Sequence, residues 1–426
     1  MSGFRFIHAG DVHLDSPLDQ LRSLDKAAAD AVALATRMSL QRIVDLAIER
    51  EVAALIIAGD LFDGPVKDAS AALWVDGQLK RLARNGIDVV LIRGNHDALS
   101  GAGKAIRWSQ GIVELGSAAP ETHLIDRVGL AVHGQSFGAR AIAEDLAAGY
   151  PRRMDGYFNV GVLHTSLGGS AAHERYAPTS LSVLESLGYQ YWALGHIHKR
   201  TEVSLGSNCW IGYCGNSQGR HVRESGPKGC YLAHVEAGAL SMCEFVATDS
   251  VRWHEAIIDV SEVNRMTDLD DLLFEQARKL VDAADARHLA VRTTFVGASR
   301  LHAELSDPFV VERLTAALAA RLHDLSCVWL ESVKIGTVSP RTDVPLAGCE
   351  LPLQCLSEVI TDVRCNSGQQ TQMLKSLDEL SRKVRGELEP IGWELWREAS
   401  RLPEFERLLQ RAEDLLRARI CNGGDV

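Results

Sequence analysis

The sequence lacks an apolar run long enough to cross a bilayer, a C-x-x-C pair and a basic domain. Its longest apolar runs, such as Val52–Ala58, have the length of a strand, whereas a membrane-spanning helix needs about 20 apolar residues. The N-terminus has no basic stretch followed by a long apolar region, so we expect no signal peptide. The nine cysteines are scattered, which argues against a disulfide framework and a zinc ribbon. We therefore expect a cytoplasmic protein without a membrane segment.

The charge and the composition further narrow the class of protein that this sequence can encode. The net charge of −11 argues against binding of a polyanion by the whole surface. If a nucleic acid is the substrate, metal ions, local arginines or a partner must supply the attraction. Hydrophobic residues make up 46% of the chain and charged residues 24%, which is ordinary for a soluble globular protein. The 426 residues favour two or three domains, and there is no internal repeat or low-complexity tract.

The first 200 residues alternate strand-like and helix-like segments, a rhythm that predicts an α/β fold with helices covering sheets. The predicted strands are residues 4–9, 53–58, 89–92, 128–133, 158–163 and 191–194. The predicted helices are residues 26–50, 69–84, 139–148 and 180–187.

The pattern changes after residue 200. Short strands separated by Gly and Asn over residues 201–247 predict hairpins. A compact second module then reads strand–helix–strand–helix–strand over residues 253–260, 269–284, 289–296, 308–323 and 328–335. Residues 337–348 look like a linker, and helices are predicted at 351–363, 373–388 and 403–419. We therefore expect three regions, at residues 1–250, 251–338 and 339–426.

Polar side chains follow five of the apolar strands, at the point where each strand ends. The sequences are HAGDVHLD, AGDLFDG, RGNHDA, NVGVLHTS and YWALGHIHK. They deliver Asp11, His13, Asp60, Asp63, Asn95, His96, Asp97, His164, His196 and His198. In open α/β sheets, ligands bind at the carboxyl ends of the strands, so these side chains predict a site.

The residue types indicate a metal site without thiolates. Carboxylate, amide and imidazole ligands together suit Mn²⁺, Fe²⁺ or Zn²⁺ better than Ca²⁺ or a structural zinc site. The seven candidate ligands are too many for one ion, but they suit two ions that share a carboxylate: Asp11, His13, Asp60, Asn95, His164, His196 and His198. Two ions about 3.5–4 Å apart can activate water and clamp both oxygens of a phosphoryl transfer.

Glycine stands immediately before four of these ligands, at Gly10, Gly59, Gly94 and Gly195. A residue without Cβ permits the sharp turn that aims the next side chain inward. Each motif alone has a plainer explanation, because D-x-H is a common polar turn and a G-D pair often caps a helix. All of them together, in order and each at a strand end, favour a functional site.

In this order, D-x-H, G-D-x-x-D, G-N-H-D, a lone strand-end His and G-H-x-H resemble the calcineurin-like metallophosphoesterases. FIHAGDVHLDSPL, YAPTS, YWALGHIHKR and GNSQGRHVRESGPKG are similar to the bacterial YhaO-like DNA repair exonucleases, relatives of SbcD, the nuclease subunit of the SbcCD complex. The resemblance covers residues 4–338, including LHAEL at 301–305. SbcD members usually carry an aromatic residue and a glycine around D-x-H, whereas this chain has Val12 and Asp15, which favours the YhaO-like branch.

The resemblance implies a four-layer sandwich of two central β-sheets flanked by helices, a small α+β capping domain at 251–338 and a helical C-terminal tail. The cap would shape how DNA reaches the metals. The tail would dock an SbcC-like coiled-coil ATPase through an apolar stripe, or its leucines would pack on their own chain. Those leucines are Leu374, Leu377, Leu380, Leu408, Leu409, Leu415 and Leu416. Whether the protein forms a homodimer stays open.

The resemblance also implies roles for single residues. One metal would be held by Asp11, His13, Asp60 and His198, and the other by Asp60, Asn95, His164 and His196, with Asp60 bridging. His96 would stabilise the transition-state phosphate or protonate the leaving oxygen, and Asp97 would orient its imidazole. Asp63 would support the loop.

Other polar and aromatic residues lie near the motifs. Arg220 and His221 face phosphates or, equally, form a surface salt bridge. His173 follows His164 in a loop, and its contact with substrate stays open. Two histidines and three tryptophans are expected in the core, namely His8, His133, Trp108, Trp192 and Trp210.

Taken together, these features predict a two-metal DNA exonuclease of DNA repair, most readily Mn²⁺-dependent, in which a bridging hydroxide attacks phosphorus in line. Two alternatives remain open. One is a phosphatase or cyclic-nucleotide phosphodiesterase that acts on small molecules. The other is a non-catalytic scaffold for an SbcC-like ATPase.

Overall fold

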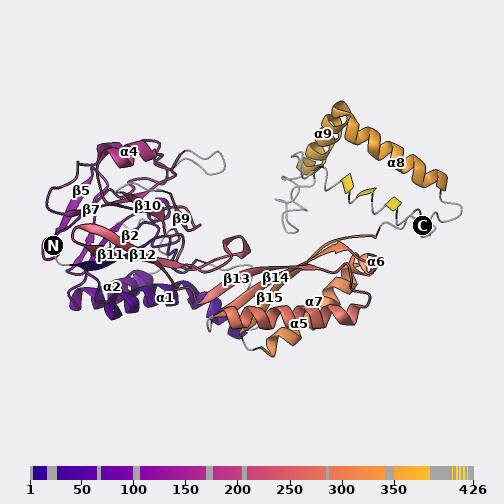
Figure 1. Cartoon of the computed structure of the whole chain (residues 1–426), viewed down its shortest axis with the longest axis horizontal. Coiled ribbons are helices and arrows are strands. Elements are labelled where there is room, and N and C mark those ends of the chain that lie inside the picture. Colours follow the sequence, from indigo (N-terminus) through magenta and orange to yellow (C-terminus); the bar gives the residue numbers. More distant parts are fainter. Residues whose placement is uncertain are drawn as a thin grey trace. The chain divides into compact units, whose positions relative to one another are not determined.

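A computed structural model gives the structure of the chain (Figure 1). The described residues are 3–16, 26–64, 69–98, 106–168, 176–203, 209–284, 287–325, 327–340 and 350–383, with single residues between 405 and 420. His173, most of the expected linker at 337–348 and the end of the helix expected at 373–388 lie outside the described residues. Of the helix expected at 403–419, only single residues are described.

The first sheet carries six strands, and its middle strands are parallel. In spatial order they are β12 (Ala239–Ala247), β11 (Gly229–Glu236), β1 (Phe4–Ala9), β2 (Ala54–Ala58), β3 (Asp88–Ile92) and β4 (Ile112–Glu114). Strands β1 to β4 run parallel, while β11 and β12 form an antiparallel hairpin at one edge. The parallel arrangement brings the carboxyl ends of β1, β2 and β3 to one edge of the sheet.

The second sheet also carries six strands. In spatial order they are β5 (Glu121–Ile125), β6 (Leu130–Gly134), β7 (Phe158–His164), β8 (Tyr191–Gly195), β10 (Trp210–Tyr213) and β9 (Thr201–Glu202). Strands β6, β7, β8 and β10 run parallel, with an antiparallel strand at each edge. The expected hairpins over residues 201–247 are present as β9–β10 and β11–β12.

Alternating side chains of the strands build the apolar layers. In β2, Ile56 faces the second sheet and joins Phe6, Val160 and Tyr191, whereas Ile57 faces the helices. This follows from the two-residue period of a strand. Each such buried aliphatic side chain contributes about 1.5–3 kcal/mol. The fold therefore has an apolar layer between its sheets and a further one on each outer face.

Helices cover the outer faces. The helices α1 (Lys26–Glu49) and α2 (Ala69–Arg84) pack on the first sheet (Figure 1). The short helix α4 (Leu181–Ser186) contributes Leu184 to the cluster around Trp192 on the second sheet. These layers confirm the predicted α/β sandwich of two central sheets flanked by helices.

A third sheet follows the sandwich and has the expected strand–helix order. Its elements along the chain are β13 (Val251–Asp259), α5 (Met266–Ala283), β14 (His288–Ala298), α6 (His302–Leu305), α7 (Pro308–His323) and β15 (Val328–Val338). The chain divides into two compact units, and the division runs through this sheet. One unit holds residues 1–255, 277–292 and 321–332, and the other holds residues 256–276, 293–320 and 333–426.

Two helices, α8 (Glu350–Cys365) and α9 (Ser367–Lys383), are described in the C-terminal region. Leu374 packs with Ile360 and Val363 of α8, in a cluster that also holds Leu409. Leu416, by contrast, is 43% exposed. The side chains of Leu377, Leu380, Leu408 and Leu415 lie outside the described residues. Within the described parts of the chain, no helix is both long and apolar enough to span a membrane.

The helix predicted at 139–148 is wrong. Only a 3-10 turn forms there, over Ala147–Gly149. The Ile142 carbonyl accepts a hydrogen bond from the Ala177 N–H, and the Asp145 carboxylate accepts one from the Thr179 hydroxyl at 3.0 Å. The Ile142 carbonyl thus accepts from a distant segment and not from a residue four positions later, as it would in a helix. The strands β4 and β5 were not predicted, because β4 has 3 residues and β5 is largely exposed.

Candidate metal centre

The strand-end residues converge at the carboxyl edges of the two sheets. Strands β1, β2 and β3 of the first sheet lead into Asp11, Asp60 and Asn95. In the second sheet, β7 ends at His164 and β8 leads into His196 and His198. Potential ligand atoms of Asp11, His13 and His198 lie within 4.8 Å of one another, and so do those of Asp11, Asp60 and His164. Asp11 belongs to both groups, so the two groups form one continuous site.

His13 and His198 meet through their Nε2 atoms, which lie 3.1 Å apart. The Nδ1 of His13 lies 3.2 Å from Asp63 Oδ1. The Nδ1 of His198 lies 2.7 Å from Glu224 Oε1. A carboxylate only accepts hydrogen bonds, so each ring carries its proton on Nδ1. The two Nε2 atoms then face each other with their lone pairs, an arrangement that a cation bound between them would satisfy.

The second group of candidate ligands surrounds His164, which is fully buried. Its Nδ1 lies 3.0 Å from the Ala58 carbonyl oxygen, which fixes a proton on that nitrogen. Its Nε2 lies 2.8 Å from Asn95 Oδ1 and 3.4 Å from Asp60 Oδ2. Burial opposes a charge on this ring, but the Asp60 carboxylate outweighs it and raises the pKa of His164 to about 9. In the metal-free chain a proton therefore occupies Nε2, and metal binding would release it.

His196 lies beside this group. Its backbone N–H donates to both oxygens of the buried Asp11 carboxylate at 3.0 Å. Its ring stands edge-on to His164, with centroids 5.1 Å apart, and edge-on to Tyr176 at 5.0 Å. The structure thus brings all seven predicted ligands to one place. Tyr176 was not predicted as a neighbour, although it belongs to the quoted YAPTS motif.

The ligand residues themselves make the sharp turns. Asp11, His13, Asp60 and His196 have φ angles of 48°, 46°, 50° and 97°, in a region that costs a non-glycine residue of order 1–3 kcal/mol. The expected role of the preceding glycines is therefore wrong in part. Only Gly59 among them has a positive φ, of 92°. Gly94 is required by close approach, since a Cβ there would lie 2.3 Å from Asp60 Oδ1.

The predicted partner of His96 is wrong. Asp97 is buried, and its carboxylate accepts hydrogen bonds from the backbone N–H groups of Leu61, Phe62 and Gly94 at 2.8–3.1 Å. The Nδ1 of His96 instead lies 3.1 Å from Asp63 Oδ1. The hydrogen bond that this Nδ1 donates to Asp63 raises the pKa of His96. Asp97 therefore shapes the loop, and Asp63, expected only to support the loop, holds the imidazole.

Asp63 also contacts His13, so one carboxylate serves two imidazoles. Burial works against its ionisation, but the hydrogen bonds from His13 and His96 outweigh burial and hold the pKa of Asp63 well below its usual range. Burial and the nearby Asp60 carboxylate raise the pKa of Asp97 to about 7. Neighbouring acids thus differ in how readily they ionise because their surroundings differ.

Arg220 and His221 lie at the side of the site near His198. The guanidinium of Arg220 lies 3.5 Å from Asp63 and 3.7 Å from Glu224. The Nε2 of His221 lies 3.6 Å from Glu224 Oε1. Two carboxylates thus already face Arg220, which lowers the positive charge that it offers a phosphate. Glu224 was missed from the sequence, and the only local signal was its place inside the quoted GNSQGRHVRESGPKG motif.

The core predictions are confirmed. His8 is fully buried and contacts the Tyr191 hydroxyl at 3.1 Å and the Leu194 carbonyl at 3.2 Å. His133 lies between Thr122 and Asn159. Trp192 is fully buried, and Trp210 stacks on Tyr191. Trp108 packs against the cluster beneath the helices.

The donor set fits a pair of cations. Buried nitrogen and oxygen acceptors converge from both sheets, and the outer nitrogens of three histidines are already held by acceptors, which is the arrangement that metal-bound histidines have. The set contains no thiolate, as expected for a site that favours Mn²⁺, Fe²⁺ or Zn²⁺. Asp60 lies between His13, at 3.8 Å, and His164, at 3.4 Å, where a shared ligand is needed.

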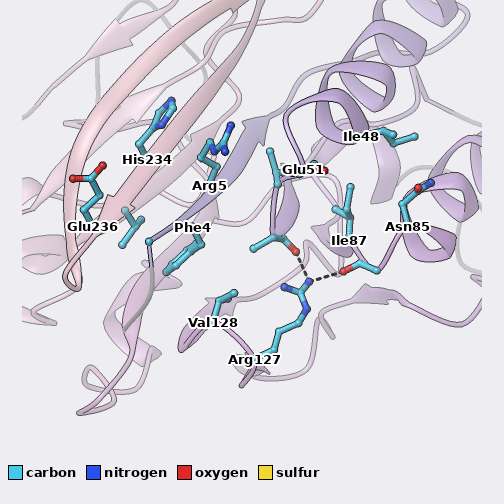
Figure 2. A pocket seen from close by; sticks show the side chains of 15 residues that line it. Phe4, Arg5, Ile48, Glu51, Asn85, Ile87, Arg127, Val128, His234 and Glu236 are labelled. Carbon is cyan, nitrogen blue, oxygen red and sulfur yellow. Dashed lines mark hydrogen bonds between the residues drawn. The ribbon is translucent and has the colours of Figure 1, made fainter.

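A separate cavity of about 870 Å³ lies at the opposite edge of the first sheet (Figure 2). It is lined by residues near the amino ends of β1, β2 and β3, including Phe4, Ala53 and Ile87. Figure 2 shows Arg127 hydrogen-bonded within it, and its partners include the Ala53 and Gly86 carbonyls. His234 and Glu236 of β11 also line this cavity.

Comparison with known proteins identifies the family. Residues 4–200 match the calcineurin-like phosphoesterase family, and residues 253–338 match the middle domain of the metallophosphoesterase YhaO. The uncharacterized metallophosphoesterase YhaO of Bacillus subtilis (strain 168) is 38% identical over 283 residues, 66% of this chain and 69% of that protein. The chain belongs to the calcineurin-like metallophosphoesterases.

More distant relatives of this metallophosphoesterase carry a DNA-related name. The DNA double-strand break repair protein Mre11 of Methanopyrus kandleri is 27% identical, and the match spans 60% of this chain and 59% of that protein. Among solved structures, the match to a dimetal phosphatase from Danio rerio covers 55% of this chain and 93% of that protein at 12% identity, with a TM-score of 0.34. Metallophosphoesterases bind two divalent metal ions, and the converging residues are candidate ligands for them.

Proposed function

We propose that this metallophosphoesterase is a two-metal DNA exonuclease that acts in DNA repair. The observation that carries the proposal is the convergence of the seven predicted ligands at one place, with His96 close to His13 and Asp60. The DNA substrate rests on the Mre11 relatives and on the resemblance of the sequence motifs. When bound, two divalent cations would supply Lewis acidity that activates water and neutralises charge on the phosphate.

The residues of the chain have distinct parts in this proposal. One cation would be held by Asp11, His13, Asp60 and His198, and the other by Asp60, Asn95, His164 and His196. His96 is suited to give a proton to the leaving oxygen, because its hydrogen bond to Asp63 raises its pKa and so favours the protonated ring. The side chain of His96 is 39% exposed, so a substrate can reach it.

The test is a nuclease assay with added Mn²⁺ on linear duplex, single-stranded and circular DNA. A nucleoside cyclic phosphate is included as a small substrate. We expect the linear DNA to be shortened from its ends and the circular DNA to stay intact. Hydrolysis of the cyclic phosphate without any cleavage of DNA would refute the proposal and favour a small-molecule phosphodiesterase.

His96→Ala tests the catalytic part. We expect its turnover to fall by roughly 10²–10⁴-fold, the usual contribution of a positioned acid or base, while Mn²⁺ binding stays. His234→Ala is the matched control, because His234 lines the separate cavity and not the candidate metal site (Figure 2). Equal turnover of the two variants would contradict the role of His96.

The proposal also includes a protein partner and a location in the cytoplasm. An SbcC-like ATPase would dock on residues 339–426, where Leu351 and Val359 of α8 are 75% and 59% exposed. The packing of Leu374 and Leu409 on their own chain accounts for part of the predicted stripe. A reducing cytoplasm is supported by the cysteines of the described residues, which are free thiols.

A further inference from the structure

The segment 215–228 surrounds His198, and the proposed reaction does not use it. The backbone N–H of Asn216 donates to the His198 carbonyl at 3.3 Å, and Lys228 Nζ donates to the same oxygen at 3.1 Å. Asn216 is fully buried, and Lys228 is 8% exposed. Two buried donors on one carbonyl fix the backbone of this predicted metal ligand.

Glu224 holds the imidazole of the same residue. Its Oε1 lies 2.7 Å from His198 Nδ1. Its Oε2 accepts hydrogen bonds from Asn216 Nδ2 and from the Arg220 backbone N–H, both at 2.8 Å. Both carboxylate oxygens are thus in use, and the side chain is 7% exposed. Asn216 and Arg220 therefore hold the carboxylate in place independently of its contact with His198.

This arrangement selects one tautomer of His198. Because a carboxylate only accepts, Nδ1 carries the proton and Nε2 keeps its lone pair. Arg220 Nη2 lies 3.2 Å from the same Nδ1. Because both nitrogens carry protons in this tautomer, no hydrogen bond joins them. The free Nε2 points at His13 Nε2, where a cation would lie.

We propose that Glu224 is a positioning residue that fixes the tautomer and the orientation of His198, and thereby strengthens one of the two metal positions. The proposal rests on the two-metal function above, but it concerns metal binding alone. A purely structural Glu224 would change the free energy of unfolding and leave metal affinity unchanged.

The experiment measures Mn²⁺ binding to the metal-free full-length chain by calorimetry. In Glu224→Gln we expect one of the two binding steps to weaken by roughly 10–100-fold, the usual effect of losing such an outer partner. The other step should change much less. Glu236→Gln, an exposed change on β11, should bind both ions as the wild type does.

A second readout is independent of metal and of activity. Long-range ¹H–¹⁵N spectra of the metal-free wild type should show His198 protonated at Nδ1, and Glu224→Gln should show a mixture of tautomers. If Glu224→Gln does not fold by circular dichroism, Glu224→Asp replaces it, since it keeps the charge but shortens the reach to His198. The same loss of Mn²⁺ affinity is then required.

The inference is overturned if the folded variant binds both ions within about twofold of the wild type, because the expected loss is roughly tenfold or more. It is equally overturned if the wild-type His198 carries its proton on Nε2. A wild type that binds two Mn²⁺ ions but cleaves no DNA would refute the proposed function and leave the role of Glu224 standing.

Discussion

The buried histidines of the chain differ in what fixes their protonation. His164 has acidic neighbours that raise its pKa to about 9, whereas burial lowers the pKa of His8 to about 3. His8 lies among aromatic rings, and its hydrogen-bond partners are the neutral groups of Tyr191 and Leu194. One residue type is thus a candidate metal ligand in one place and a core residue in another.

The lowered pKa of His8 predicts an acid-sensitive core. The unfolded chain binds a proton at His8 below a pH of about 6.5, while the folded chain stays neutral there down to a pH of about 3. Stability therefore falls as the pH falls through 6.5. From pH 7 to 5.5 we expect His8 to remove about 1.2 kcal/mol from the free energy of unfolding. Denaturant titrations of the metal-free wild type and of His8→Gln should differ in pH slope by this amount, and parallel slopes would contradict it.

At the scale of elements, the site depends on how closely the strand ends approach one another. Gly94 follows β3, and a Cβ on it would lie 2.3 Å from Asp60 Oδ1 and 2.7 Å from His164 Cε1. Gly77 lies in α2, and a Cβ there would meet nothing within 4 Å. Substituting each glycine with alanine therefore compares a crowded position with an open one.

Gly94→Ala should destabilise the chain by about 1–3 kcal/mol, because the surrounding packing has to shift, and should weaken Mn²⁺ binding. Gly77→Ala should stabilise it by about 0.5–1 kcal/mol, since Ala is the better helix former. Thermal unfolding and calorimetric Mn²⁺ titration measure both effects. If Gly94→Ala binds Mn²⁺ as tightly as the wild type, the prediction is wrong, and the strand ends have room to move apart.

The elements that the sequence predicts well are those with a strong local pattern. Strands such as β2 are uniformly apolar, and a polar motif marks the end of each. The helix expected at 139–148 fails because Asp145 and the Ile142 carbonyl bond to residues more than 30 positions away. Local periodicity carries no information about such pairing.

For the site too, local sequence patterns do not reveal contacts between distant residues. The ligands were predictable because each follows a strand, and parallel strands deliver their ends to one edge. Asp97 was misassigned because it adjoins His96 in sequence, yet consecutive residues of the short helix α3 (Asn95–Ala98) do not face each other. Asp63 and Glu224 hold histidines that are 33 and 26 positions away, and only the folded chain reveals them.

At the scale of the whole molecule, the candidate ligands are divided between two sheets. Asp11, Asp60 and Asn95 follow strands of one sheet, and the three later histidines belong to the other. Bound cations would therefore link the two sheets, and metal binding should stabilise the folded chain.

We expect Mn²⁺ at 100 times its dissociation constant to add about 2.7 kcal/mol per site to the free energy of unfolding. The melting temperature should rise with Mn²⁺ concentration and fall again on addition of a chelator. Asp60→Asn, which alters the carboxylate that the two proposed metal positions share, should show a much smaller rise. A melting temperature that is indifferent to metal in the wild type would contradict a site shared by the sheets.

The left-handed backbone at Asp11, His13, Asp60 and His196 has a consequence for the life of the protein in a cell. A newly made chain that meets no metal bears these strained turns without the stabilisation that bound cations would add. Such a chain spends more time open to proteases, and small losses of stability alter abundance several-fold. The supply of metal during synthesis, and not only during turnover, would then set how much of the protein accumulates.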